Sequence, residues 1–135
     1  MIVREIMVES VLTVEPEQTL RDALELLQSK HIRQLPVVEN GRLVGIITDR
    51  DIKRASPSIL SHIDQEEYDR VLDSTKVRQL MTREPLTVAP DTPLKTALKV
   101  FITKKVGSLP VVANGKVVGI VTQIDLLRVL YNTLP

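Results

Sequence analysis

The stretch Gly45-Ile46-Ile47-Thr48-Asp49-Arg50-Asp51 occurs twice, because it returns 74 positions later as Gly119-Ile120-Val121-Thr122-Gln123-Ile124-Asp125. Each copy is typical of the end of a buried β-strand that runs into the first turn of a helix. The likeness extends to both sides, since Val3–Arg54 aligns with Val77–Arg128 without a gap. We therefore interpret the chain as a tandem duplication, which is a signal of architecture.

The shared residues predict the same elements in each copy: a short lead-in helix, an extended segment, an amphipathic helix, two strands and a closing helix. Thr19 and Asp22 have the spacing of a capping box at the start of the first amphipathic helix. In the second copy Thr92 and Pro93 predict a cap followed by a first-turn proline. A hairpin turn is predicted between the two strands of each copy, at Asn40-Gly41 and Asn114-Gly115.

A repeat of this size exposes much of its apolar surface when it stands alone. The predicted fold is therefore α+β, with duplicated β-α-β-β-α half-domains packed on each other about a pseudo-two-fold axis. The predicted division is residues 1–56 for the first repeat, 57–75 for a linker and 76–135 for the second repeat. A linker helix is expected over Ser61–Leu72, capped by Ser61 and Asp64, with its charged residues in solvent or with Tyr68 as part of a lid.

The composition narrows the classes of function. The chain has 135 residues, is 43% hydrophobic, carries a net charge of +1 and contains no cysteine. Few aromatic residues and a near-neutral charge disfavour nucleic-acid binding. No apolar run approaches the roughly 18 residues of a membrane span, and no leader is apparent, so a cytoplasmic protein without membrane attachment is expected.

No residue pattern supports catalysis. The two histidines, His31 and His62, do not have the spacing of a metal site, and no glycine-rich phosphate loop or Ser/His/Asp set occurs. We expect a protein that is not an enzyme, with no catalytic residues, no metal and no required cofactor.

The repeated Thr-x-x-Asp has two interpretations. In the first, Thr48 with Asp51 and Thr122 with Asp125 are capping boxes, worth about 1 kcal/mol each. In the second, the carboxylate accepts hydrogen bonds from the vicinal hydroxyls of a ribose, and the threonine assists at a sugar or phosphate oxygen. The sequence leaves both open.

At these residues the chain resembles the CBS domain family, named after cystathionine β-synthase. The resemblance lies in G-[IV]-[IV]-T-x-x-D preceded by L-P-V-V, N-G and V-G, and it covers nearly the whole chain except the linker and the last residues. Two such units in tandem resemble a CBS pair, or Bateman module. The pair also resembles stand-alone bacterial CBS proteins of the acetoin-utilisation type.

The resemblance implies a sensor of adenosyl ligands, namely AMP, ADP, ATP or a relative such as S-adenosylmethionine. It implies that Asp51 and Asp125 bind the ribose, with Thr48 and Thr122 at the sugar or phosphate. It further implies a base pocket and loop that one repeat often lends to the other; these residues are Val11, Leu12, Ile32, Arg33, Gln34, Pro85, Leu86, Val106, Gly107 and Ser108.

The copies differ in the residues next to Thr-x-x-Asp. We call the junction of strand and helix that holds this threonine and aspartate the corner of each copy. Asp49-Arg50 is replaced by Gln123-Ile124, and Arg33-Gln34 by Gly107-Ser108. Arg33 and Arg50 are candidate phosphate ligands, because a guanidinium can hold a phosphate through two hydrogen bonds; the other interpretation of each is an exposed charge. We therefore expect two unequal sites.

The predicted function is a non-catalytic regulatory module that binds an adenosyl ligand in clefts between the repeats, forms a homodimer and acts on an effector protein. The alternative is a structural or oligomerisation module with vestigial clefts, which uses the last helix at Leu126, Val129 and Leu130. A weaker alternative is a nucleic-acid binder. The sequence does not distinguish among the adenosyl ligands, and it does not identify the effector.

Overall fold

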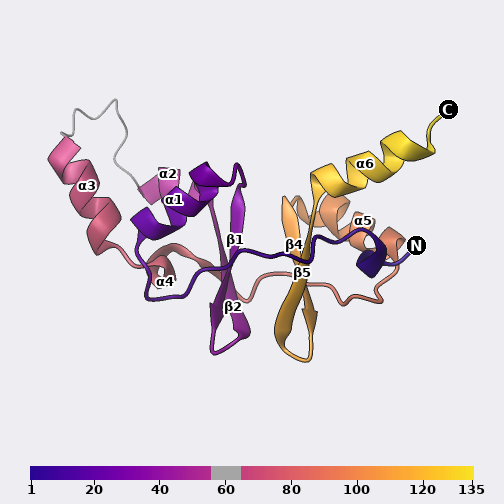
Figure 1. Cartoon of the computed structure of the whole chain (residues 1–135), viewed down its shortest axis with the longest axis horizontal. Helices are drawn as coiled ribbons and strands as arrows, with labels where there is room; N and C mark the ends of the chain where they lie inside the picture. The colour runs from indigo at the N-terminus through magenta and orange to yellow at the C-terminus, as the bar shows by residue number, and fades with distance from the viewer. Residues whose placement is uncertain (56–64) are drawn as a thin grey trace. The chain divides into compact units, whose positions relative to one another are not determined.

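The structure is a computed structural model that describes residues 1–55 and 65–135. Its elements follow the predicted order in each copy (Figure 1). In chain order they are the 3-10 helix η1 (Val3–Glu5), α1 (Leu20–Ser29), β1 (Gln34–Glu39), β2 (Arg42–Thr48), α2 (Asp49–Ala55), α3 (Gln65–Ser74), α4 (Val77–Leu80), β3 (Thr82–Arg83), α5 (Leu94–Lys104), β4 (Ser108–Ala113), β5 (Lys116–Thr122) and α6 (Gln123–Thr133). The α+β class and the duplication are confirmed.

The amphipathic helices α1 and α5 begin differently. The predicted capping box of α1 is confirmed, since the Asp22 amide donates to Thr19 Oγ1 at 3.2 Å and the Thr19 amide donates to Asp22 Oδ2 at 3.0 Å. The predicted cap at Thr92 is wrong, because its hydroxyl accepts from the Ala89 amide at 2.9 Å instead. The residue equivalent to Thr19 is Pro93, which precedes α5 without a side-chain cap.

Both predicted hairpin turns are confirmed. Asn40 and Gly41 have φ of 53° and 79°, and Asn114 and Gly115 have 54° and 79°. Positive φ at both central residues is the geometry of a type I′ turn, which matches the twist of two antiparallel strands. The turns place β1 beside β2 and β4 beside β5.

The described residues form two compact units that differ from the two sequence repeats. Unit 1 comprises Met1–Val11, Gly41–Leu43 and Pro85–Pro135, and unit 2 comprises Leu12–Asn40 and Val44–Glu84. The lead-in segment of each copy is thus part of the unit built from the other copy. The predicted division of the sequence at residues 56 and 75 stays a prediction, as does the pseudo-two-fold packing.

Each lead-in segment pairs with the strand that ends at Thr-x-x-Asp. In unit 1 the Val8 amide donates to the Ile120 carbonyl at 2.9 Å, and the Ile120 amide donates to the Val8 carbonyl at 3.0 Å. In unit 2 Thr82 is paired with Ile46 through the β3–β2 ladder. Because these positions are related by the repeat, the same exchange occurs in both units.

The glycine at the start of each repeated stretch permits this close approach. A Cβ on Gly45 would lie 2.7 Å from Met81 Sδ and 2.9 Å from the Thr82 carbonyl oxygen. A Cβ on Gly119 would lie 2.6 Å from Met7 Sδ and 3.1 Å from the Val8 carbonyl oxygen. Both distances to sulfur are too short for a real contact, so a side chain at either position would displace the lead-in segment.

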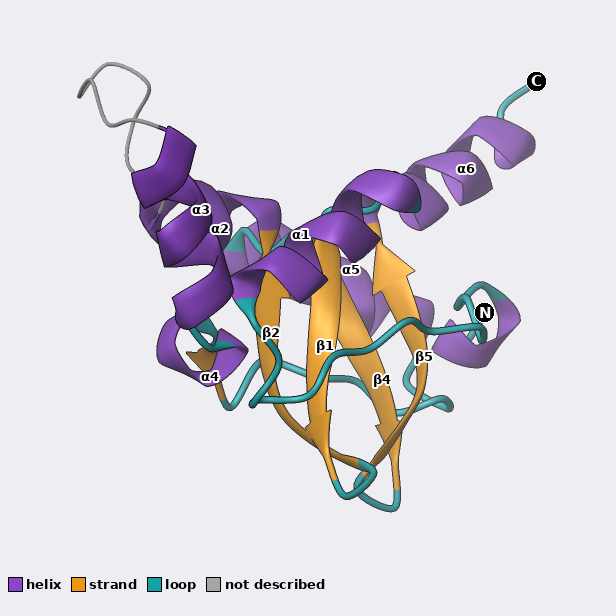
Figure 2. Ribbon diagram, turned by 60° about the vertical axis from the view of Figure 1, so that its left-hand side comes forward, coloured by secondary structure: helices purple, strands orange, loops and turns teal. Residues whose placement is uncertain are grey.

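Each unit has its own apolar core. In unit 2 the helices α1, α2 and α3 gather near the end of the β1–β2 hairpin opposite its turn (Figure 2), and Leu20, Leu35 and Ile47 are fully buried. In unit 1 the corresponding core contains Val3, Leu109 and Val121, with Val129 packed against it. Leu126 and Val129, named in the oligomerisation alternative, thus contribute to this core.

The linker helix α3 packs against α1 in unit 2. The predicted cap at Ser61 and Asp64 lies outside the described residues, and the helix begins at Gln65. Leu72 is buried and Tyr68 packs against the core of unit 2. The described part of the linker is therefore a part of this unit. Its charged residues Glu66, Glu67 and Arg70 are exposed, as predicted, and the role of the helix as a lid stays a prediction.

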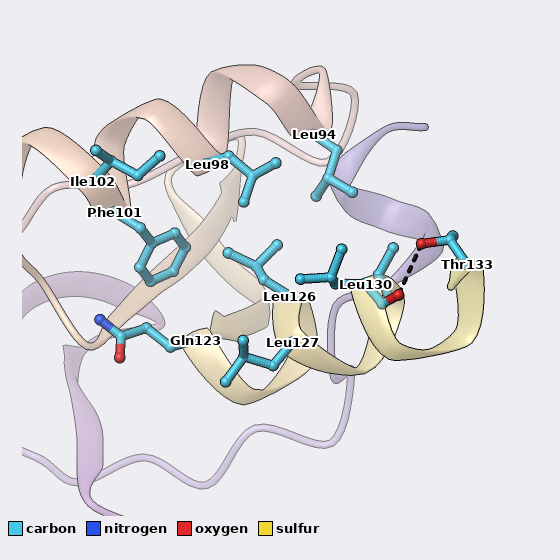
Figure 3. Close-up of a pocket in the computed structure, with 10 residues that line it drawn as sticks. Leu94, Leu98, Phe101, Ile102, Gln123, Leu126, Leu127, Leu130 and Thr133 are labelled. Atoms are coloured by element: carbon cyan, nitrogen blue, oxygen red, sulfur yellow. Dashed lines mark hydrogen bonds between the residues drawn. The ribbon is translucent and has the colours of Figure 1, made fainter. Parts of the chain in front are cut away.

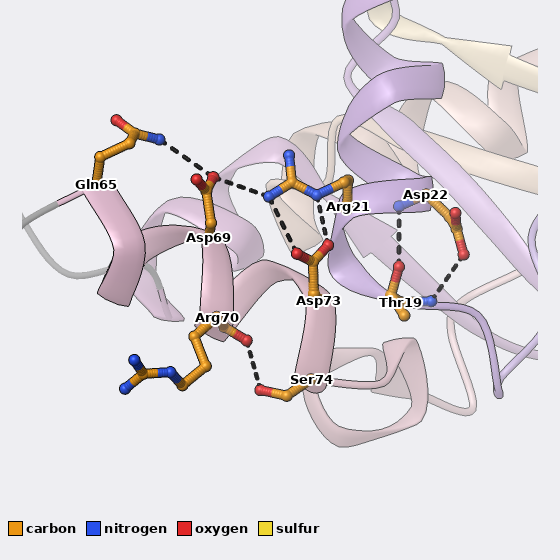
Figure 4. Close-up of polar contacts among 8 residues, drawn as sticks. All are labelled: Thr19, Arg21, Asp22, Gln65, Asp69, Arg70, Asp73 and Ser74. Carbon is orange, nitrogen blue, oxygen red and sulfur yellow. Dashed lines mark hydrogen bonds and ion pairs between the residues drawn. The ribbon is translucent and has the colours of Figure 1, made fainter.

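A polar network joins α3 to α1 (Figure 4). Arg21 Nη2 donates to Asp69 Oδ1 at 2.9 Å, and Arg21 Nε donates to Asp73. Asp69 also accepts from the Gln65 amide group at 3.1 Å. The hydrogen bond from Arg21, followed by that from Gln65, lowers the pKa of the Asp69 carboxyl, and the hydrogen bonds to Asp73 and Asp69 raise the pKa of Arg21.

Replacement of Gly45 by alanine is expected to destabilise the protein. The added methyl group must displace both a methionine side chain and a backbone carbonyl, which typically costs about 1–3 kcal/mol in a packed site. The free energy of unfolding of Gly45→Ala and of wild type, measured by urea denaturation, tests this. Equal stability of the two proteins would contradict the close approach of Met81 and Thr82.

Replacement of Arg21 by glutamine is expected to destabilise the docked α3 at neutral pH and to have less effect in acid. Because the pKa of Asp69 is lowered in the folded state, its stabilising effect is present above its unfolded pKa of about 3.9 and is lost as the pH falls through the lower folded value. Urea denaturation of both proteins at pH 7 and near pH 3, in low salt, measures the difference. Lys95→Gln, at the equivalent position of α5, is the control, and a pH-independent deficit for Arg21→Gln would contradict the prediction.

Candidate ligand-binding site

The Thr-x-x-Asp residues join a strand to a helix without an intervening loop in both units. The Thr48 amide donates to Asp51 Oδ2 at 2.9 Å, and the Asp51 amide donates to Thr48 Oγ1 at 3.1 Å. The Thr122 amide donates to Asp125 Oδ2 at 2.8 Å, and the Asp125 amide to Thr122 Oγ1 at 3.4 Å. The capping interpretation is therefore confirmed at both corners.

The cap uses only one oxygen of each carboxylate. Asp51 and Asp125 are half-buried, and within residues 1–55 and 65–135 no hydrogen bond reaches Oδ1 of either residue. A carboxylate oxygen can accept two hydrogen bonds. Each corner thus presents an oriented acceptor that the cap does not consume.

In unit 2 the corner lies next to the segment that precedes β1. The Asp49 amide donates to the Arg33 carbonyl at 3.0 Å, which joins the first turn of α2 to this segment. Ile32 packs against the core, whereas the side chains of Arg33 and Arg50 are exposed. Both arginines are close to the corner in sequence, and their side chains are exposed. This arrangement fits a phosphate ligand, and it equally fits the interpretation as exposed surface charges.

In unit 1 the corner lies next to the start of β4. Ser108 is the ladder partner of Thr122, so the two hydroxyl-bearing residues are paired across neighbouring strands. The Gln123 side chain donates to the Val106 carbonyl at 3.0 Å, and the Gln123 amide lies 3.4 Å from the Gly107 carbonyl oxygen. These contacts hold the predicted loop Val106, Gly107 and Ser108 beside the predicted corner of the same copy.

The side chain of Ser108, next to Thr122, carries a buried hydroxyl group that lacks a hydrogen-bond partner among the described residues. The residue is only 6% exposed, and its Oγ has no hydrogen-bond partner in the described part of the chain. Buried hydroxyl groups are normally hydrogen-bonded, because an unsatisfied one costs about 1–3 kcal/mol. The sequence placed Ser108 in a loop, but its burial and its pairing with Thr122 depend on the register of β4 and β5.

Four of the remaining predicted residues lie in extended segments that each form a bridge with one strand in the parallel direction, and the fifth, Gln34, is the first residue of β1. Leu12 precedes the pairing of Val14 with Val37, and Leu86 precedes the pairing of Val88 with Val111. Leu12 and Leu86 are exposed, whereas Val11, Pro85 and Gln34 are half-buried. Leu12 and Gln34 belong to unit 2, and Val11, Pro85 and Leu86 belong to unit 1. The exchange of loops between repeats stays a prediction.

Two further features of the described residues concern metals and membranes. No three His, Cys, Asp or Glu side chains converge there in a way that could hold a metal ion. Among the same residues, no helix has the length and apolar character that a membrane crossing requires.

Comparison with known proteins identifies the family. The model of the CBS domain matches residues 3–58 and again residues 77–132. The chain belongs to the CBS domain family. It carries two CBS domains in tandem, as the resemblance implied.

Relatives of known structure share the whole pair. The crystal structure of CBSX2 in complex with AMP has a TM-score of 0.82 at 28% identity and covers 99% of both chains. The CBS domain pair of protein MJ0100, in complex with 5-methylthioadenosine and S-adenosyl-L-methionine, has a TM-score of 0.82 at 28% identity over 99% of this chain and 98% of that chain. A putative acetoin utilization protein (AcuB) from Vibrio cholerae is 30% identical over 98% of this chain and 91% of its own, with a TM-score of 0.81.

Curated relatives differ in length. A CBS domain-containing protein of Dictyostelium discoideum is 37% identical over 98% of this chain and 93% of its own length. The chain spans less than half of several others, including 22% of an inosine-5'-monophosphate dehydrogenase.

Replacement of Ser108 by alanine is expected to leave the protein at least as stable as wild type. The change removes an unsatisfied buried hydroxyl, so the free energy of unfolding should rise by about 1 kcal/mol. Urea denaturation measures it, with Ser74→Ala as the control, because the Ser74 hydroxyl donates to the Arg70 carbonyl at 2.6 Å. A loss of stability in Ser108→Ala would show that Oγ has a partner in the folded protein.

Proposed function

We propose that the chain is a non-catalytic regulatory module that binds an adenosyl ligand at its Thr-x-x-Asp corners. The ligand class is AMP, ADP, ATP or a relative such as S-adenosylmethionine. The observation that carries the proposal is the free Oδ1 of Asp51 and Asp125, in a chain whose structural relatives hold AMP, 5-methylthioadenosine and S-adenosyl-L-methionine. The ligand would bind one conformation of the module more tightly than another and so shift the equilibrium between them. The effector protein would respond to this shift.

The proposed role of each corner follows from its free acceptors. Oδ1 of Asp51 or Asp125 accepts a hydrogen bond from a ribose hydroxyl while Oδ2 remains in the cap. Thr48 Oγ1 and Thr122 Oγ1 both accept from the helix amide. The Thr48 hydroxyl can donate its proton to a sugar or phosphate oxygen, whereas the Thr122 hydroxyl donates to Asp125 Oδ2 at 3.1 Å and would meet a sugar hydroxyl as an acceptor. Ser108 Oγ supplies one more hydroxyl beside Thr122.

The two corners are expected to prefer different ligands. Arg33 and Arg50 lie near the corner of unit 2, whereas Gly107 and Ile124 stand at the equivalent positions in unit 1. A guanidinium favours a phosphate, so Arg33→Gln or Arg50→Gln should weaken AMP or ATP more than S-adenosylmethionine.

A structural module without a ligand is the second candidate, because the confirmed caps by themselves account for the repeated threonine and aspartate. In that case Thr48, Asp51, Thr122 and Asp125 only fix the starts of α2 and α6. The two candidates predict different responses to the same substitution, because the cap and the ligand use different oxygens.

The test is the melting temperature of the full chain with adenosine nucleotides, guanosine nucleotides and S-adenosylmethionine. A ligand at 100 times its dissociation constant should stabilise the protein by about 2.7 kcal/mol. Asp51→Asn and Asp125→Asn, made singly, keep one acceptor oxygen for the cap and replace the other by an amide donor. At least one of them should shrink the ligand-induced shift well beyond its effect on the free protein.

Asp22→Asn is the matched control, because Asp22 occupies the same position in the capping box of α1. It should reproduce the effect on the free protein and leave the ligand-induced shift unchanged. No shift with any ligand, or a shift equal in wild type and both corner variants, would refute binding at these corners and favour the structural module.

A further inference from the structure

Sulfur occurs at three places in the chain, and two of them are related by the repeat. The sequence has three methionines, Met1, Met7 and Met81, and no cysteine. Met1 is 65% exposed, whereas Met7 and Met81 are half-buried and occupy equivalent positions in the two copies. Oxidants convert the thioether of methionine to a sulfoxide, which changes a flexible apolar side chain into a polar one. These three thioethers are therefore the sulfur groups on which an oxidant can act.

Each half-buried thioether lies against the glycine that begins the repeated stretch. A Cβ on Gly45 would lie 2.7 Å from Met81 Sδ and 3.0 Å from its Cγ. A Cβ on Gly119 would lie 2.6 Å from Met7 Sδ and 3.0 Å from its Cγ. The thioether thus occupies the space that a side chain in place of the glycine would need, and the same fit occurs in both units.

The site beside each glycine suits a thioether and does not suit a sulfoxide. Met81 packs against the core of unit 2. Met7 packs against the core of unit 1, whose residues include Phe101 and Leu126 between α5 and α6 (Figure 3). A backbone carbonyl of the lead-in segment lies on the same side of each glycine, and a carbonyl cannot donate a hydrogen bond to a sulfoxide oxygen. Oxidation would therefore place a larger, polar group against an apolar core and next to another hydrogen-bond acceptor.

Both methionines belong to the lead-in segments, which pair with the strands that end at the corners. Directly after Met7, Val8 exchanges hydrogen bonds of 2.9 and 3.0 Å with Ile120. In unit 2 the residue after Met81 pairs with Ile46. Ile46 and Ile120 each lie two residues before the threonine of a corner. A methionine that no longer fits against the glycine would therefore loosen the strand pairing close to the corner of the same unit.

The two lead-in segments are anchored differently. In unit 2 the segment continues from the docked helix α3, and Arg78 Nε also donates to Glu17 Oε1 at 2.8 Å. Arg4 and Asp91 occupy the equivalent positions in unit 1, and no ion pair joins them in the described part of the chain. The segment that carries Met7 is therefore expected to loosen more readily than the one that carries Met81.

We propose that Met7 and Met81 are oxidation sites, at which a hydroperoxide loosens the lead-in segments. The sulfur atom attacks one oxygen of hydrogen peroxide, so that a sulfur–oxygen bond forms and the O–O bond breaks. The hydroxide that leaves takes the proton from the transferred oxygen and departs as water, so the sulfur is oxidised and the peroxide is reduced. The proposal does not rest on the proposed ligand, because it concerns packing within the free protein.

The test is treatment of the full chain with hydrogen peroxide, followed by removal of the oxidant. Peptide mapping by mass spectrometry should find sulfoxide at Met7 and Met81 as well as at the exposed Met1. Urea denaturation should then show a lower midpoint. The Ile120 amide, which donates to the Val8 carbonyl, should exchange its hydrogen with solvent about tenfold faster or more. Methionine sulfoxide reductases should restore both properties.

The chain with both Met7→Leu and Met81→Leu is the matched control, because leucine has a similar volume and no sulfur. Its midpoint and amide exchange, each compared before and after peroxide, should stay the same although Met1 is still oxidised. Met7→Leu alone should protect the midpoint more than Met81→Leu alone. Three results would overturn the proposal: Met7 and Met81 remain unoxidised at a dose that converts Met1 fully, both are oxidised with no change in midpoint or exchange, or peroxide lowers the midpoint of the control as much as that of wild type.

Discussion

The reciprocal hydrogen bonds between threonine and aspartate at the two strand-to-helix junctions determine what the corners can do. Since β2 passes into α2 and β5 into α6 without a loop, each threonine is both the last residue of a strand and the cap of a helix. The cap fixes the carboxylate through Oδ2 and leaves Oδ1 as an acceptor of defined direction. Capping and ligand binding are therefore compatible uses of one carboxylate, and the observation of a cap does not argue against a sugar at the same residue.

Much of the architecture could be predicted because it is encoded locally and encoded twice. Asn-Gly between apolar strands predicted both type I′ turns, and the Thr19 and Asp22 spacing predicted the start of α1. The cap at Thr92 failed because a hydroxyl two residues before a helix has other amides within reach, here that of Ala89. The docking of α3 could not be predicted, because Arg21 and its partners Asp69 and Asp73 are far apart in sequence and no periodicity relates them.

The candidate site was predictable to a similar degree. The Thr-x-x-Asp pattern identified the corners and their caps, but which oxygen stays free depends on side-chain geometry. Ser108 was named only as a member of a loop, and its burial with an unpaired hydroxyl follows from the register that places it opposite Thr122. The exchange of lead-in segments could not be predicted, because a repeated sequence does not determine which copy a segment packs against. The only local sign of it is the glycine at positions 45 and 119, where the lead-in segment leaves no room for a side chain.

The duplication also explains how one fold carries different surfaces. The residues of the two cores and corners are shared, whereas the outer faces have diverged in polarity, with Gln28 and Lys53 in one copy and Ile102 and Leu127 in the other. The helix α6 illustrates this division. It begins at the Thr122 and Asp125 corner, and its Gln123 donates to the Val106 carbonyl in the loop before β4. Its outward residues Ile124 and Leu127 are 55% and 57% exposed, whereas Arg50 and Lys53 stand at these positions in α2. The cap and the outer face use different positions of the same helix, so the surface can change in polarity while the cap is kept.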